Sequence, residues 1–108
     1  MLAFTALSDP TRRRIVELLA QGERSSGELG ECFEISAPAV SQHLKVLKEA
    51  HLVQVRAEAQ RRIYALDPTG FDELEGWVRN IRGFWTERLD VLEQRLLANP
   101  ETKKRRRP

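Results

Sequence analysis

Cysteine and histidine are scarce in this sequence. Its 108 residues include one cysteine, Cys32, and two histidines, His43 and His51. A single cysteine excludes a disulfide within the chain, and one thiol with two isolated imidazoles does not supply the ligand set of a tetrahedral zinc site. We therefore expect no metal and no cofactor, and we expect Cys32 to pack as a small apolar side chain between Leu29 and Phe33.

Long apolar runs and catalytic patterns are missing as well. No stretch approaches the roughly 18 apolar residues of a membrane span, and the first residues lack the basic-then-apolar pattern of a secretion signal. The sequence has no glycine-rich phosphate loop and no Ser-His-Asp candidate, and its carboxylates stand near arginines as on a solvated helix face. We therefore expect a cytoplasmic protein that is not an enzyme and has no membrane partner.

Positive charge is concentrated in two segments. The net charge is +2, but the last ten residues hold five basic side chains and one acidic side chain, and residues 36–66 hold five basic and two acidic. The composition, 41% hydrophobic and 31% charged, is typical of a globular protein. We place one small domain at residues 1–98 and a basic, disordered tail at 99–108, which would add sequence-independent attraction to DNA.

Helix caps mark the starts of three helices. Asp9 precedes Pro10, which suits the first position of a helix. Ser25 is followed three residues later by Glu28, the pattern of a capping box, and Ser36 precedes a third helical segment that runs to about residue 50. Because a tight turn joins the two later helices, they predict a helix-turn-helix.

The next segment predicts a β-hairpin with its tip near residues 58–60, because apolar and polar residues alternate there. Val53, Val55 and Ala57 are expected to face one way, and on the second strand Ile63 is expected to face away from Arg62 and Tyr64. The stretch "DPTG" then breaks the hairpin. From about residue 71 to 98, apolar residues recur every three or four positions, which predicts a long helix. A short amphipathic helix is expected near the N-terminus.

The third helix has two faces with different chemistry. Val40, Leu44 and Leu47 fall on one side and point into the core, so the other side is exposed. Gln42 can bond an adenine edge, and Lys45 can reach a guanine edge or a phosphate. Paired arginines at the hairpin tip suit phosphates or a narrow minor groove. The predicted contacts to double-stranded DNA are Ser36, Ala37, Pro38, Ala39, Ser41, Gln42, His43, Lys45, Lys48, Arg56, Arg61 and Arg62.

Three segments, "ALSDPTRRRIVELL", "SAPAVSQHLKVLKEAHLV" and "RRIYALDP", resemble the ArsR/SmtB family of bacterial repressors. The resemblance covers roughly residues 3–97. It implies a mainly α fold with a small β-hairpin (α+β), namely a winged helix-turn-helix with additional N- and C-terminal dimerisation helices. It also implies a homodimer that binds a palindromic operator and usually represses transcription. The implied dimer interface comprises Leu2, Phe4, Leu7, Trp77, Val78, Ile81, Phe84, Trp85, Leu89 and Leu92.

The usual metal ligands of that family are missing here. Cysteines begin the helix before the turn in arsenic-sensing members, and the matching positions are Ser25 and Gly27. Another sensor site uses histidines on the last helix, which has none in this sequence. Three alternatives stay open: a protein-interaction module, a repressor with an unrecognised metal or metabolite site, and a small-molecule pocket bordered by Trp77, Phe84 and Trp85. The operator, the effector and the direction of regulation are not identified by the sequence.

Overall fold

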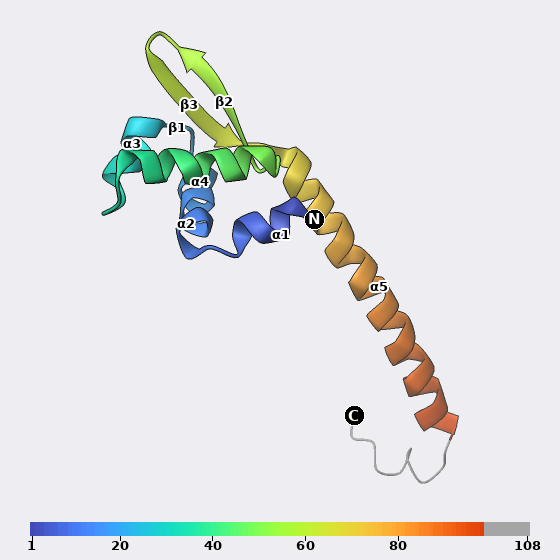
Figure 1. The fold of residues 1–108 in the computed structure, drawn as a ribbon. Coiled ribbons are helices and arrows are strands. Elements are labelled where there is room, and N and C mark those ends of the chain that lie inside the picture. The colour runs from blue at the N-terminus through green and yellow to red at the C-terminus, as the bar shows by residue number, and fades with distance from the viewer. Residues whose placement is uncertain (99–108) are drawn as a thin grey trace. The chain divides into compact units, whose positions relative to one another are not determined.

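The computed structural model describes residues 1–98 and contains two compact units (Figure 1). The first is Met1–Leu74, and the second begins at Glu75. Within the described residues, no helix is both long enough and apolar enough to cross a membrane. The predicted tail at 99–108 lies outside the described residues, so the predicted disorder of the tail and the domain boundary at residue 98 stay predictions.

The first unit has the element order of a winged helix-turn-helix. Its elements are α1 (Leu2–Leu7), α2 (Pro10–Ala20), β1 (Arg24–Ser25), α3 (Ser26–Glu31), α4 (Ala37–Glu49), β2 (Val53–Glu58), β3 (Arg61–Leu66) and the first turns of α5 (Pro68–Ala98). The β2–β3 hairpin projects away from the helices as the wing (Figure 1). This order confirms the predicted fold class, and the short strand β1 is an element that the sequence did not predict.

The predicted caps are confirmed. The Arg12 N–H donates to the Asp9 carboxylate at 3.0 Å, at the start of α2. Ser25 and Glu28 form the reciprocal capping box of α3, with both hydrogen bonds at 3.1 Å. The Ala39 N–H donates to the Ser36 hydroxyl at 3.2 Å. Each cap satisfies an N–H group that a helix end leaves without a partner, so the start of α4 is determined by its own sequence.

The core orients α4. Val40, Leu44 and Leu47 are 2%, 1% and 0% exposed and pack against the other buried side chains of the unit. That cluster includes Ala3, Ala6, Ile15, Leu18, Leu19, Leu29, Ala50, Leu52, Val53 and Tyr64. Because one face of α4 is buried against this cluster, its opposite face is turned outward.

The hairpin register decides which residues of its two strands share a face. The strands are antiparallel in the order β1-β3-β2, and Val55 lies opposite Tyr64 while Arg56 lies opposite Ile63. Tyr64 therefore shares the core face with Val55, and Ile63 lies on the face opposite to Tyr64, as predicted. Ile63 is nevertheless buried, because it lies on the middle strand. The turn that sets this register, between Glu58 and Arg61, is two residues long.

Cys32 is exposed, so the prediction that it packs in the core was wrong. Helix α3 ends at Glu31, which makes Cys32 the C-cap residue rather than part of the buried face with Leu29. Its thiol donates to the carbonyl oxygen of Glu28 at 3.4 Å.

Helix α5 begins earlier than predicted. Its first residue is Pro68, and the Asp67 carboxylate accepts the Thr69 N–H at 3.0 Å. The predicted end of the hairpin before "DPTG" is confirmed, because β3 ends at Leu66. Gly70 is buried within α5, and its N–H donates to the His51 carbonyl at 2.8 Å. His51 ends α4 with a φ of 57°, a left-handed conformation that glycine usually supplies. The segment that ends the hairpin therefore also connects the end of α4 to the start of α5.

Candidate nucleic-acid interface

The outward face of α4 carries the predicted base-reading side chains. Ser41, Gln42 and Lys45 are exposed, and Lys48 follows one turn later on the same helix. The predicted contacts in the first turn are small or weakly polar: Ser36, Ala37 and Pro38 are exposed, and Ala39 is half-buried. Short side chains at a helix N-terminus leave its N–H groups accessible to an anion.

A groove lies between α4 and the wing, and we call it the α4–wing groove. It is lined by Ser26 from α3, by Ser41, Leu44, Lys45 and Lys48 from α4, and by Val55, Arg62 and Tyr64 from the hairpin. Arg62 faces the groove because it occupies the sheet face of Tyr64. Within residues 1–98, the side chains of Lys45, Lys48 and Arg62 form no ion pair and no hydrogen bond. The groove therefore presents three cations that no carboxylate of the described residues neutralises.

The other wing arginines pair with carboxylates. The Arg56 guanidinium donates hydrogen bonds to the carboxylate of Glu23 and, at 3.1 Å, to that of Glu58, and the bond to Glu23 is the main cause of the raised pKa of Arg56. Arg61 bonds to Glu28 at 2.7 Å. The predicted basic wing is thus divided: Arg56 and Arg61 are paired, whereas the Arg62 side chain has no partner among residues 1–98.

His43 points toward α2 and does not line the groove. Its Nδ1 lies 3.3 Å from the Arg12 guanidinium and 4.0 Å from the Asp9 carboxylate. Arg12 also donates to the carbonyl oxygens of Ala6 at 2.6 Å and Thr5 at 3.2 Å, which ties α1 to α2. The backbone N–H of Arg12 is the largest cause that lowers the pKa of Asp9, and His43 adds to it. His43 therefore belongs to the packing of α4 on α2.

The predicted dimer residues form two exposed apolar surfaces, each described within its own unit. On α1, Leu2 is 65% exposed, Phe4 is exposed and Leu7 is half-buried. On α5, the exposed predicted residues are Trp77, Val78, Ile81, Phe84, Trp85, Leu89 and Leu92. These side chains are unusually large for solvent-facing positions, which marks both surfaces as candidate interfaces.

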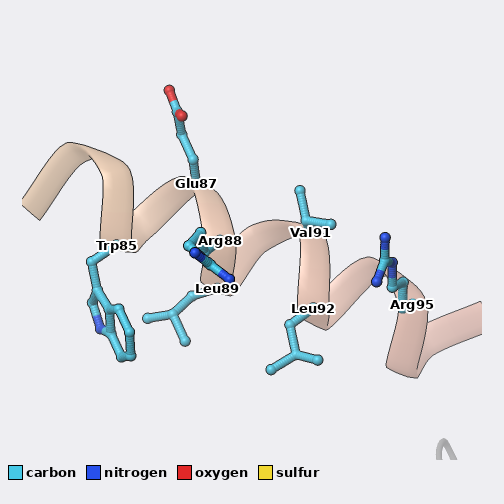
Figure 2. Close-up of a pocket in the computed structure, with 7 residues that line it drawn as sticks. All are labelled: Trp85, Glu87, Arg88, Leu89, Val91, Leu92 and Arg95. Carbon is cyan, nitrogen blue, oxygen red and sulfur yellow. The ribbon is translucent and has the colours of Figure 1, made fainter.

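Figure 2 shows the distal part of the α5 surface. Trp85, Leu89 and Leu92 project from one side of the helix, while Glu87 and Val91 project from the opposite side. Residues of α5 alone line the hollow at this position. Within the described chain, no second element completes it as a small-molecule pocket.

Sequence reasoning missed the partners of the wing arginines. Glu23 and Glu28 lie 33 residues before Arg56 and Arg61, respectively, and only the capping pattern of Glu28 is visible in the sequence. It also missed Ser26, which reaches the groove from α3. In the part of the chain that the structure describes, no three His, Cys, Asp or Glu side chains are grouped to hold a metal ion.

Comparison with known proteins identifies the family. Residues 9–55 match the family model described as bacterial regulatory protein, arsR family. The HTH-type transcriptional regulator Rv2034 of Mycobacterium tuberculosis is 52% identical over 87 residues, which cover 81% of this chain and 78% of that protein. The transcriptional repressor SdpR of Bacillus subtilis is 39% identical over 77 residues, 71% of this chain and 86% of the repressor.

A solved structure agrees with both relatives. The homodimeric winged helix-turn-helix DNA-binding domain Mb0332 from Mycobacterium bovis, solved by NMR, superposes with a TM-score of 0.62 at 28% identity. The match covers 76% of each chain. With this fold, the capped α4 and the two similar regulators, the protein belongs to the ArsR family of winged helix-turn-helix transcriptional regulators.

Proposed function

We propose that this regulator binds a palindromic operator as a homodimer and represses transcription. The observation that carries the proposal is the α4–wing groove, in which Lys45, Lys48 and Arg62 lack internal partners among residues 1–98, beside the outward-facing Gln42. A cation without an internal partner is available to a phosphate at no cost of a broken ion pair. The repressor activity of SdpR and the homodimer of Mb0332 support the proposal by similarity.

The proposed contacts are of two kinds: some residues contact base edges, and the others contact the DNA backbone or allow close approach to it. Gln42 would read a base edge from the major groove, and Lys45 would bond a guanine edge or a phosphate. Ser36, Ala37, Pro38, Ala39 and Ser41 would let the start of α4 approach the groove wall closely. Lys48 and Arg62 would bind the flanking backbone and fix the register of α4.

A second copy of the chain would cover the apolar surfaces. Trp85 is 63% exposed and Phe84 is 66% exposed in the single chain, so burial of these rings against a partner removes large apolar areas from water. Two copies of α4 related by a twofold axis would enter successive major grooves about 34–36 Å apart. We propose that the dimer acts in the cytoplasm, because the bacterial chromosome is located there.

The test is a titration of fluorescent duplexes with the purified protein at several salt concentrations. Gln42→Ala should reduce the preference for the operator over random DNA, because it removes a base contact. Arg62→Ala should weaken binding to all sequences and lower the slope of log K against log salt by about 0.9, the value of one lost phosphate contact. Equal loss on operator and random DNA for Gln42→Ala would refute its reading role.

The same titration separates the alternatives. If the wild-type protein prefers no promoter fragment over random DNA at any salt concentration, a protein-interaction module is the better assignment. If zinc, arsenite or a small metabolite changes operator affinity, the protein has an effector site, although the described residues contain no cluster of metal-binding side chains. Affinity that is unchanged by zinc, arsenite or a chelator would support regulation without a metal.

A further inference from the structure

Two neighbouring arginines of the wing project from opposite faces of the hairpin. Successive residues of a strand alternate between faces, and Arg62 lines the α4–wing groove with Tyr64. Arg61 points the other way and bonds to Glu28 of α3 at 2.7 Å. The same division holds at Arg56, which lies opposite Ile63 and pairs with Glu23 and Glu58. Within the described residues, the groove-face cations lack partners, and those on the other face have them.

Glu28 is held in place from two directions. Its Oε1 accepts the Ser25 N–H at 3.1 Å and the Arg61 guanidinium at 2.7 Å. Ser25 is only 5% exposed and lies opposite Ile63 in the sheet. The capping box therefore fixes the Glu28 carboxylate at the junction of β1 and α3. The ion pair with Arg61 connects this fixed carboxylate to the wing beside its tip.

The charge of Glu28 persists at neutral pH. The Ser25 N–H, the Ser25 hydroxyl and the Arg61 guanidinium all lower its pKa, in that order of importance. If Arg61 left for a phosphate, it would exchange one anionic partner for another. It would also leave an ionised carboxylate without its cation beside a polyanion, where like charges repel. The exchange therefore gains little for Arg61, whereas the Arg62 side chain has no such bond to break within the part of the chain that the structure describes.

We propose that Glu28 and Arg61 act as a strut that positions the wing on α3, and that Arg61 stays on Glu28 in the DNA complex. Arg62 is then the guanidinium at the wing tip that contacts phosphate. Arg61 and Glu28 are positioning residues, and Arg56 with Glu23 repeats the arrangement further along the hairpin. This inference rests on the proposed function, because it concerns the orientation of the wing toward DNA.

The experiment measures operator affinity across salt for the wild type, Arg61→Ala, Glu28→Gln and the double variant. Glutamine also serves at the third position of a capping box, so Glu28→Gln removes the ion pair while keeping the cap. Arg61 and Glu28 have side chains that are 60% and 50% exposed, and such pairs are weak, so each single variant should lose at most about fivefold in affinity. The double variant should lose no more than either single one.

The salt slope distinguishes positioning from contact. Arg61→Ala should leave the slope unchanged, whereas Arg62→Ala should lower it by about 0.9. Arg61→Lys, which retains the positive charge, should recover most of the affinity. Glu31→Gln is the matched control, because Glu31 lies on the same helix and forms no ion pair among residues 1–98. The operator affinity of Glu31→Gln measures the general effect of removing one carboxylate near DNA, and the affinity of Glu28→Gln is compared with that value.

Two results would overturn the inference. One is a slope that falls for Arg61→Ala as it does for Arg62→Ala, and the other is tighter binding by Glu28→Gln than by Glu31→Gln. Either would show that Arg61 contacts DNA and that Glu28 competes for it. These failures differ from failure of the proposed function, in which the wild-type protein itself binds no DNA and the inference falls with it. Circular dichroism of each variant verifies that the fold is retained.

Discussion

Gly70 has no room for a β-carbon, so Gly70→Ala should destabilise the protein. A Cβ at this position would lie 2.5 Å from the carbonyl oxygen of His51 and 2.7 Å from that of Ala50. Both are backbone atoms, so they move only if the end of α4 moves. Overpacking of this kind costs about 1–3 kcal/mol, and contact with backbone favours the upper end of that range.

The opposing effect is the better helix propensity of alanine, worth about 1 kcal/mol. We therefore expect Gly70→Ala to lower the free energy of unfolding by about 2 kcal/mol. A change of that size shifts Tm by roughly 8–16 °C in a domain of this length. The loss would come from the junction that holds α5 against the turn at His51, where the Gly70 N–H bonds to the His51 carbonyl.

Matched controls lie on the same helix. Outside their own helical turns, no atom of the described residues lies within 4 Å of the position that a Cβ would occupy at Gly76 or Gly83. Alanine at either should therefore stabilise the protein by up to about 1 kcal/mol. Urea and thermal unfolding would be followed by circular dichroism at one protomer concentration, because the stability of a dimer depends on concentration. If Gly70→Ala proves as stable as Gly76→Ala, the inferred close approach at Gly70 is refuted.

Three further predictions concern pH, the wing turn and the dimer. The pKa of Asp9 is lowered mainly by the Arg12 N–H, so its stabilising effect is present above the unfolded value of 3.8 and is lost as pH falls through the folded value. Asp9→Asn keeps a hydrogen-bond acceptor at the cap, so its Tm should change less than that of the wild type between pH 6 and pH 2. Identical dependence of Tm on pH in the two proteins would contradict this prediction. Ala59→Gly should raise the free energy of unfolding by about 1 kcal/mol in urea, because Ala59 has a φ of 56°; a loss of stability would count against a left-handed turn. Trp85→Asp should yield monomers in sedimentation velocity, whereas Glu87→Ala on the opposite side should stay dimeric, and unchanged dimers for both would remove Trp85 from the interface.

Local chemistry explains what the sequence predicted well. The caps at Asp9, Ser25 and Ser36 depend on residues within three positions of one another, so they are visible in a single segment. The inward face of α4 follows from helical spacing, and Leu44 and Leu47 are buried as predicted. Because that face is buried, the residues on the other side of α4 must be exposed. The exposed groove residues Ser41, Lys45 and Lys48 could therefore be predicted from the sequence.

Contacts between distant segments explain the rest. Glu28 reads as a capping residue, and nothing within α3 indicates that Arg61 would reach it. The hairpin register depends on a two-residue turn that lacks the usual Asn-Gly signal, so the sequence did not predict that Val55 and Tyr64 share a face. The sequence shows "DPTG" as the end of the hairpin, and only the position of the His51 carbonyl shows that Gly70 is required for close approach.

Selection of bound sites by the purified protein from a pool of random duplexes tests whether α4 reads DNA sequence. We expect a palindromic motif whose half-sites are separated by about one helical turn, roughly 10–10.5 base pairs, as two copies of α4 require. Gln42→Ala should select a motif with less information at the positions that Gln42 contacts. A pool that shows no enriched motif after repeated rounds, or the same motif with wild type and Gln42→Ala, would contradict the assignment of α4 as the reading helix.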